Sequence, residues 1–355
     1  MNKNHSGTRR GLLLLNLGTP DSPRPEDVGR YLKEFLMDAK VIDIPWILRW
    51  FFVNVLIVPK RKFASAEAYE KIWTERGSPL LFHLEDLKNG VSQAMLQSQS
   101  GDIQVEMAMR YGNPSVKKAL SSFKKNGVDE IVVFPLYPQF AESSTLSSQD
   151  HVNREADRLG LRSKLRFVPA FYESPDFISA FASSIRPVLE NERPDHLLMS
   201  FHGLPERHLK RLDQTGQHCF QKADCCEKMS SANENCYRAQ SFATARALAN
   251  ELSVVREKYT VSFQSRLGRT PWIRPFTDEV LQELAKKGVR KLAVICPSFV
   301  ADCLETIEEI GIRGRETFHA AGGESLIYIP CLNSESAWAQ AIHRIALNET
   351  SQLSK

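Results

Sequence analysis

Eight short apolar runs alternate along the chain with longer segments in which apolar residues recur at helical spacing. Runs of this length predict buried strands, and their regular alternation with helices predicts an α/β fold built on parallel sheets. The expected strands are residues 11–17, 103–109, 130–136, 164–168, 196–201, 259–263, 291–296 and 325–329.

Two pairs of similar segments indicate that the chain consists of two similar Rossmann-like halves. Residues 12–20 (LLLLNLGTP) match 197–205 (LLMSFHGLP), and 125–128 (KNGV) match 286–289 (KKGV). In doubly wound sheets, ligands bind beyond the carboxyl ends of the strands. We therefore expect a cleft between the halves, lined by the loops that follow the strands.

The predicted organisation has three parts. An N-terminal α/β half spans 1–190 and includes an apolar segment at 41–62; a C-terminal α/β half spans 191–330 and carries a cysteine insertion at 214–236. Residues 331–355 are expected to form a C-terminal helix that packs back on the body. No loop carries a GxGxxG or P-loop motif, so the sequence lacks the glycine-rich loops that bind the phosphates of nucleotides.

The apolar segment allows two interpretations. Residues 41–58 are interrupted only by Asp43, Arg49 and Asn54, and a basic triplet follows at 60–62. These interruptions leave fewer uninterrupted apolar residues than a membrane-spanning helix needs. The segment is either a core helix or an exposed apolar lip whose basic edge suits a membrane surface or a flat apolar ligand.

Composition places the chain among ordinary globular proteins of a reducing compartment. Its 355 residues are 42% hydrophobic and 25% charged, and the formal net charge of +4 comes without a basic run of the length that nucleic acid binding uses. The apolar run near the N-terminus breaks at Asn16 with no small-residue cleavage site, which argues against a signal peptide. Seven cysteines, four of them crowded between 219 and 236, favour a cytoplasmic location.

Two titratable residues follow predicted strands and are expected to face the cleft. His202 is well placed to accept a proton or bind a metal near neutral pH, although a packing role is the alternative. Glu305 lies three residues beyond Asp302, which we expect to cap a helix. With Glu308 and Glu309 these carboxylates form either a solvated acidic face or a path for cations and protons toward the histidine.

Four cysteines in a polar insertion indicate a metal site. Cys219, Cys225, Cys226 and Cys236 fall in or beside the polar stretch 214–235. The adjacent pair departs from the C-x2-C spacing of zinc sites and is easier to accommodate on two irons, so an iron–sulfur centre is favoured over zinc. Disulfides or free thiols are the alternative. The insertion is not expected to supply a residue to the cleft.

Six motifs, taken together, resemble those of the ferrochelatase family, and their order and spacing match from about residue 11 to 346. They are 15–20 (LNLGTP), 109–112 (MRYG), 134–139 (FPLYPQ), 200–205 (SFHGLP), 272–275 (WIRP) and 302–305 (DCLE). The resemblance implies the two-half chelatase fold with a C-terminal helix near 335–346, and insertion of Fe²⁺ into protoporphyrin IX, the last step of haem synthesis.

The resemblance also implies roles for individual residues. His202 falls on the family's catalytic histidine and Glu305 on its essential glutamate, both beside the substrate iron. The positions assigned to porphyrin binding are Leu17, Arg110 and Tyr111 in the pocket, Lys60, Arg61 and Ser78 at the propionates, and Cys303, where many members have histidine. Cys219, Cys225, Cys226 and Cys236 resemble the internal [2Fe–2S] segment of some bacterial ferrochelatases.

The expected partners are a porphyrin, Fe²⁺ and the inner face of a membrane, with no nucleic acid and with a monomer or homodimer as the assembly. Two other functions remain open at this point. A coproporphyrin ferrochelatase differs only in how many propionates it holds, and a non-catalytic haem-binding or redox-sensing protein does not need His202 and Glu305 together.

Overall fold

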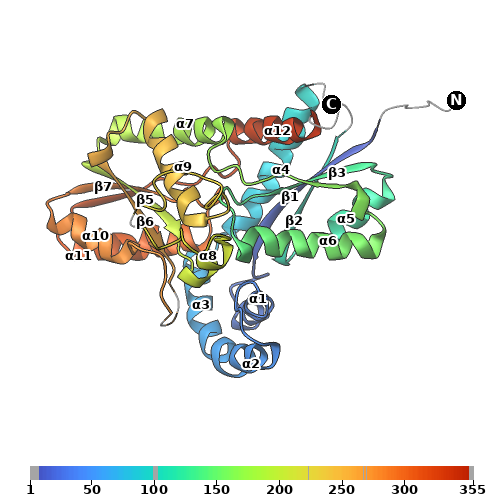
Figure 1. Cartoon of the computed structure of the whole chain (residues 1–355), viewed down its shortest axis with the longest axis horizontal. Helices are drawn as coiled ribbons and strands as arrows, with labels where there is room; N and C mark the ends of the chain where they lie inside the picture. The colour runs from blue at the N-terminus through green and yellow to red at the C-terminus, as the bar shows by residue number, and fades with distance from the viewer. Residues whose placement is uncertain (1–7, 99–102, 223, 267, 269, 352–355) are drawn as a thin grey trace.

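Two four-stranded parallel sheets form the framework of the protein (Figure 1). The computed structural model describes residues 8–98, 103–222, 224–266, 268 and 270–351. All eight expected strands are present, which confirms the α/β fold with two similar halves. They are β1 (Arg10–Thr19), β2 (Ile103–Gly112), β3 (Glu130–Pro135), β4 (Leu165–Phe167), β5 (His196–His202), β6 (Tyr259–Gln264), β7 (Lys291–Ile295) and β8 (Ser325–Tyr328).

The two sheets share one topology, with strand orders β2-β1-β3-β4 and β6-β5-β7-β8. β1 and β5 hold equivalent places, so the sequence similarity between 12–20 and 197–205 reflects a structural equivalence. Leu12, Leu13, Leu14 and Leu15 are each at most 1% exposed, because helices cover both faces of a parallel sheet.

Helices connect and cover the strands throughout the described part of the chain. The α-helices are α1 (Pro25–Leu36), α2 (Trp46–Phe51), α3 (Val58–Ile72), α4 (Pro79–Gln97), α5 (Val116–Lys125), α6 (Ser147–Leu159), α7 (Pro175–Glu192), α8 (Glu206–Leu212), α9 (Tyr237–Glu251), α10 (Thr277–Lys286), α11 (Arg315–Ala320) and α12 (Ser336–Ser351). Three π-helices, η1 (Phe52–Ile57), η2 (Glu142–Leu146) and η5 (Leu304–Gly314), and two 3₁₀ turns, η3 (Arg162–Lys164) and η4 (Arg256–Lys258), complete the set.

The C-terminal helix α12 packs against α4 and α7, on the side of the molecule opposite α1–α3 (Figure 1). Trp338 in α12 is fully buried, and its ring contacts the rings of Phe134, Phe171 and Phe177. Because Phe134 lies in β3 and Phe177 in α7, this one side chain joins the first sheet to a helix that also packs on α9.

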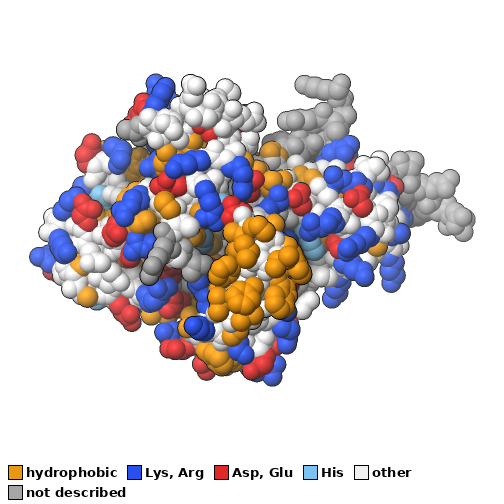
Figure 2. All heavy atoms as spheres, turned by 60° about the horizontal axis from the view of Figure 1, so that its bottom comes forward, with side chains coloured by type: hydrophobic (Ala, Val, Ile, Leu, Met, Phe, Trp, Pro, Cys, Tyr) orange, Lys and Arg blue, Asp and Glu red, His pale blue; other side chains and the backbone are white. Residues whose placement is uncertain are grey.

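The apolar segment forms an exposed lip, so the core-helix interpretation is wrong. Trp46 is 62% exposed and Ile47 is 74% exposed, and within 46–57 only Arg49 and Val53 are buried. Figure 2 shows the apolar side chains of this region gathered in one continuous patch, which we call the apolar lip (41–62). Among the helices of the described residues, none is both long and apolar enough to cross a bilayer.

A buried arginine explains why the lip turns outward. The guanidinium of Arg49 donates to the carbonyl oxygens of Ile42 and Ile44 at 3.1 and 3.0 Å. Arg49, the only polar residue of α2, is thereby turned inward, and the apolar side chains of this short helix are left to solvent.

Candidate active site

A cavity of about 890 Å³ opens between the two sheets, where the loops after their strands meet. The first half contributes the end of β1, α1 and α3, and the second contributes the ends of β5 and β6, the loop after β7, and η5. This volume lies in the range that buries a cofactor-sized ligand. The cleft expected from the sequence is therefore present.

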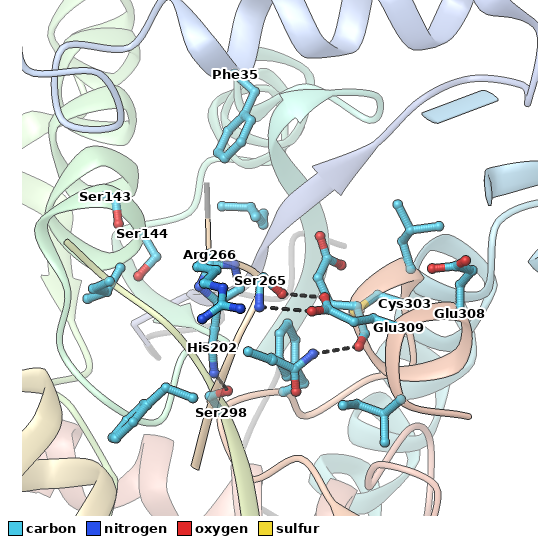
Figure 3. Close-up of a pocket in the computed structure, with 18 of the residues that line it drawn as sticks. Phe35, Ser143, Ser144, His202, Ser265, Arg266, Ser298, Cys303, Glu308 and Glu309 are labelled. Atoms are coloured by element: carbon cyan, nitrogen blue, oxygen red, sulfur yellow. Dashed lines mark hydrogen bonds between the residues drawn. The ribbon is translucent and has the colours of Figure 1, made fainter. Parts of the chain in front are cut away.

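His202 is the last residue of β5 and projects into this cavity (Figure 3). Its Nδ1 lies 2.6 Å from the carbonyl oxygen of Gly203, and because that oxygen only accepts, Nδ1 carries the hydrogen. The backbone N–H of His202 donates to Ser298 Oγ at 3.0 Å, and the ring lies edge-on to Phe299. The imidazole is therefore fixed from behind, and Nε2 is left as a proton acceptor.

Glu305 is the second residue of η5 and also lines the cavity. Gln264 at the end of β6 donates to its carbonyl oxygen at 2.6 Å, which ties the start of η5 to the second sheet. Burial first, and the Glu305 charge next, raise the pKa of Cys303, so this residue remains a neutral thiol.

The structure corrects the expected helix start. The capping position belongs to Cys303, which forms a reciprocal capping box with Thr306, and not to Asp302. Asp302 is only 6% exposed, and its carboxylate accepts from Tyr328 and, at 2.7 Å, from Asn333. These partners come from β8 and the loop beyond it. The Asp302 carboxylate is therefore bound by tertiary contacts and does not belong to the acidic face expected with Glu305, Glu308 and Glu309.

The remaining carboxylates are held in different ways. Glu308 pairs with Arg313 at 2.8 Å, whereas Glu309 accepts the backbone N–H of Ser265 at 2.8 Å (Figure 3). Figure 3 shows His202 on one side of the cavity and Cys303 with Glu309 on the other. Glu305 thus differs from Glu308 and Glu309, because within the described residues its carboxylate has no hydrogen bond or ion pair of this kind and lines the cavity.

Four of the residues assigned to porphyrin binding line the cavity: Leu17, Arg61, Ser78 and Cys303. Ser78 is buried and shares a hydrogen bond with the hydroxyl of Thr19 at 2.7 Å. Lys60, one residue before Arg61, is exposed on α3 and is not among the lining residues.

Arg110 and Tyr111 are placed elsewhere by the structure, in a buried network around Asp38. Arg110 donates to Asp38 at 2.5 Å and to Ser147 at 2.8 Å, and the Tyr111 hydroxyl donates to Asp38 at 2.9 Å. The charge of Asp38 draws both side chains toward it, and the described cavity lining does not include them. Although its burial opposes ionisation, hydrogen bonds from the Ser147 hydroxyl and the Lys40 backbone N–H, with the charge of Arg110, lower the pKa of Asp38.

Several lining residues were not singled out individually from the sequence. Arg266 follows β6, pairs with Asp278 at 2.7 Å, and lines the cavity (Figure 3). Tyr237 at the start of α9, and Ser298 after β7, also reach the cavity. The rule that loops after strands line such clefts locates Arg266 and Ser298, but nothing in the pattern distinguishes them from their neighbours.

The four cysteines of the insertion are all buried, each at most 9% exposed. The Sγ atoms of Cys225 and Cys226 lie 3.7 Å apart, and Cys219, Cys225 and Cys236 line one small pocket. Hydrogen bonding with Cys219 is the main cause that raises the pKa of Cys236 to about 11. Among the described residues, no group of three or more His, Cys, Asp or Glu has the geometry of a formed metal site.

This arrangement defines a two-lobed α/β enzyme that encloses a cofactor-sized ligand between a fixed imidazole and a carboxylate. A sequence model of the ferrochelatase family matches residues 9–350. Ferrochelatase of Azotobacter vinelandii strain DJ is 48% identical over 339 residues, covering 95% of this chain and 98% of that protein. Ferrochelatase of Bdellovibrio bacteriovorus strain HD100 is 45% identical over 333 residues, covering 94% and 97%.

The chain therefore belongs to the ferrochelatase family, which confirms the resemblance of the six motifs. A solved structure, SirB from Bacillus subtilis with Fe³⁺, superposes with a TM-score of 0.51 at 12% identity over 97% of this chain and 98% of that one. At this identity the likeness concerns the fold alone.

Proposed function

We propose that His202 and Glu305, facing one cavity, insert Fe²⁺ into protoporphyrin IX. The chain is a ferrochelatase, a porphyrin metal chelatase of the lyase class, and its product is protohaem. The observation that carries the assignment of residues is the hydrogen bond from His202 Nδ1 to the Gly203 carbonyl, because it leaves Nε2 to accept a proton inside the cavity.

Metal insertion first requires the porphyrin to bend. A flat macrocycle keeps its two N–H groups and its nitrogen lone pairs in the ring plane, where an approaching ion cannot reach them. A rigid cavity that binds the bent ring more tightly than the flat ring lowers the barrier by differential binding. The rigidity comes from the parallel sheets and from the buried hydrogen bonds at the strand ends.

Two protons leave the macrocycle for each Fe²⁺ that enters. His202 accepts one pyrrole proton at Nε2, and Glu305 serves the opposite side, where it takes up the second proton or holds the arriving ion loosely. Oxygen donors alone do not select iron, because divalent affinity rises beyond Fe²⁺ in the series. Zn²⁺ and Co²⁺ are therefore expected to be inserted in vitro.

Different lining residues contact the apolar ring and the charged propionates of the porphyrin. Leu17 packs on the macrocycle, and Arg61 with Ser78 binds propionate, since a guanidinium and a hydroxyl are suitable donors to a carboxylate. Lys60 adds positive charge on α3 next to Arg61, while Arg110 and Tyr111 support the first half through Asp38.

The cysteine insertion is proposed to hold a [2Fe–2S] cluster through Cys219, Cys225, Cys226 and Cys236. The donor chemistry fits, because all four thiols are buried, the Sγ atoms of Cys225 and Cys226 lie 3.7 Å apart, and the guanidinium of Arg238 donates to Cys226 Sγ at 3.1 Å, as suits a sulfur that bears negative charge. When bound, the cluster supplies covalent ordering of a loop that has little apolar surface of its own.

The apolar lip (41–62) is proposed to touch a membrane surface from the cytoplasmic side. Its exposed indoles and phenyl rings suit the interface, and the basic triplet at 60–62 suits anionic headgroups. We expect a variant with Ser at Trp50, Phe51 and Phe52 to lose co-sedimentation with anionic vesicles, while Leu96→Ser, which removes an even more exposed apolar side chain on α4, retains it. Unchanged binding of the triple variant contradicts the proposal.

The role of Glu305 is tested against a matched carboxylate. Glu316 lies on α11 outside the cavity lining and is exposed. We expect Glu305→Gln to reduce turnover strongly and Glu316→Gln to leave it unchanged, measured by the visible absorption of the metalloporphyrin formed from protoporphyrin or coproporphyrin. Equal turnover in the two variants contradicts the role of Glu305, and faster metallation of coproporphyrin contradicts the assigned substrate.

A further inference from the structure

Most of the basic side chains that line the cavity are already paired with carboxylates of the protein. The described lining holds five arginine and lysine residues: Arg61, Lys71, Arg207, Arg266 and Arg313. Four of them are ion-paired with a carboxylate at 2.6–3.8 Å, whereas Arg61 on α3 has no ion pair with any described residue. The described lining therefore offers one unpaired guanidinium to an anionic ligand.

Arg207 on α8 is occupied by the base of the apolar lip. Its Nε donates to both oxygens of the Asp43 carboxylate at 2.9 and 3.1 Å, and its Nη2 donates to Asp43 Oδ1 at 2.6 Å. Asp43 also accepts from Arg211 at 3.2 Å, and Arg211 in turn pairs with Glu142. Two guanidiniums thus meet two carboxylates. Because the Asp43 side chain is only 15% exposed, a ligand that took Arg207 would leave a costly, poorly hydrated carboxylate behind.

Arg266, in the loop after β6, is occupied in the same way. Its Nη2 lies 2.7 Å from Oδ2 of Asp278, which also lines the cavity, and its Nη1 lies 3.2 Å from Oε1 of Glu279. Glu279 also pairs with Arg274 at 3.0 Å, so two guanidiniums again meet two carboxylates. Both guanidiniums stack on the ring of Phe276 at 4.2 Å from its centroid. This stacking holds Arg266 in place independently of the carboxylates.

This pairing limits the number of propionates that the cavity can bind. Protoporphyrin IX carries two propionates on one edge of the ring, whereas coproporphyrin carries four, so its other two rings bring two more negative charges. A carboxylate taken out of water needs a cation or several hydrogen-bond donors. The first pair of propionates has Arg61 and Ser78. A further pair meets guanidiniums whose charge is already compensated, beside carboxylates that repel it.

We infer that Asp43 and Asp278 are specificity-determining residues: by pairing with Arg207 and Arg266 they keep these guanidiniums from further propionates, and the cavity rejects a porphyrin that carries four. The inference rests on the proposed function and deepens it, because it names the feature of the substrate that the cavity accepts, propionates along one edge only. Specificity then comes from a repulsive element as well as from the attractive contact with Arg61.

The test compares the metallation of two porphyrins. We measure kcat/KM for Zn²⁺ insertion into protoporphyrin IX and into coproporphyrin, and the ratio of the second value to the first is the readout, because a general loss of activity cancels in it. Asp43→Asn removes the main partner of Arg207, and Asp278→Asn with Glu279→Gln removes both partners of Arg266. Each variant is expected to raise the ratio about fivefold, the upper end for one partly exposed charge pair.

Two controls show whether the gain comes from charge at the cavity. Glu283→Gln with Glu316→Gln removes two charges from exposed positions outside the described lining, and we expect the wild-type ratio. Adding Arg207→Gln to the first variant, or Arg266→Gln to the second, is expected to cancel the gain, since the released guanidinium binds the extra propionate. The gain is also expected to shrink in 1 M salt, where charges are screened within about 3 Å.

A rise in either variant that the added arginine substitution cancels supports the inference. An unchanged ratio in both variants, or a gain that survives loss of the arginine, overturns it. If Asp43→Asn does not fold, the variant at Asp278 and Glu279 decides alone, because these side chains are about half exposed.

Failure of the proposed function gives a different result. A wild-type protein that metallates neither porphyrin, or that prefers coproporphyrin, refutes the assigned reaction or substrate, and the inference falls with it. A wild-type preference for protoporphyrin that neither variant alters leaves the assigned reaction standing and refutes only the role of the two aspartates.

Discussion

Gly203→Ala tests how precisely the strand end must hold His202. A methyl group on Gly203 would lie 2.7 Å from the carbonyl oxygen of Gln264 and 3.3 Å from the ring of Trp272. An ordinary carbon–oxygen contact is about 3.3 Å, so the backbone must move by about 0.6 Å. The Gly203 carbonyl is the partner of His202 Nδ1, and its N–H donates to the same Gln264 oxygen at 2.7 Å. The shift is thus passed directly to the imidazole.

The expected costs follow from that displacement. Overpacking of this size destabilises a protein by about 1–3 kcal/mol, and misplacement of a catalytic group by about 1 Å costs about 10²-fold in rate. We therefore expect Gly203→Ala to remain folded with a lower Tm, and to lose about tenfold in kcat or more for zinc insertion.

The assay combines thermal unfolding, porphyrin binding by fluorescence and metalloporphyrin formation by visible absorption. Gly90→Ala is the matched control: its methyl group would lie 3.4 Å from Ala339 Cβ, an ordinary contact, and alanine favours the helix by up to about 1 kcal/mol. A Gly203→Ala protein with wild-type Tm and wild-type kcat refutes the argument that the β5–β6 junction positions the imidazole.

Three further outcomes are expected. Arg207 holds the pKa of Asp43 at about 2, so the stability from this contact between the halves is present above about pH 4 and is lost as the pH falls through about 2; Asp43→Asn should lose this pH-dependent step in Tm. Cys236→Ser should lose a red-brown absorbance and melt earlier, and zinc or no metal in anaerobically purified protein contradicts the cluster. Trp338→Ala should cost about 3–5 kcal/mol in urea unfolding, and a near-zero cost contradicts the joining role of α12.

The strands were predictable because burial on both faces of a sheet requires continuous apolar runs. The segments 12–20 and 197–205 resemble each other because they form equivalent strands, β1 and β5, in the two sheets. His202 and Glu305 could be proposed because they follow strands and fall in the family's motifs. The apolar lip remained undecided, since exposure depends on where Arg49 finds its partners.

The acidic face and part of the cavity lining required tertiary information. An α-helical spacing placed Asp302, Glu305, Glu308 and Glu309 on one face, but η5 is a π-helix, whose wider turns change which side chains align. The Asp302 carboxylate does not share that face, because it is hydrogen-bonded to a partner about thirty residues later in the chain. Tyr237 reaches the cavity only through the packing of α9, which no local pattern reveals.

The most direct test of the central claim is a single-turnover experiment on His202→Ala with protoporphyrin IX and Fe²⁺ under anaerobic conditions. Porphyrin fluorescence reports binding, and visible absorption reports insertion in the same mixture. Loss of the proton acceptor predicts a porphyrin Kd within a few-fold of wild type and an insertion rate lowered by about 10² or more. Insertion at the wild-type rate with tight porphyrin binding contradicts the assignment of His202 and the mechanism built on it.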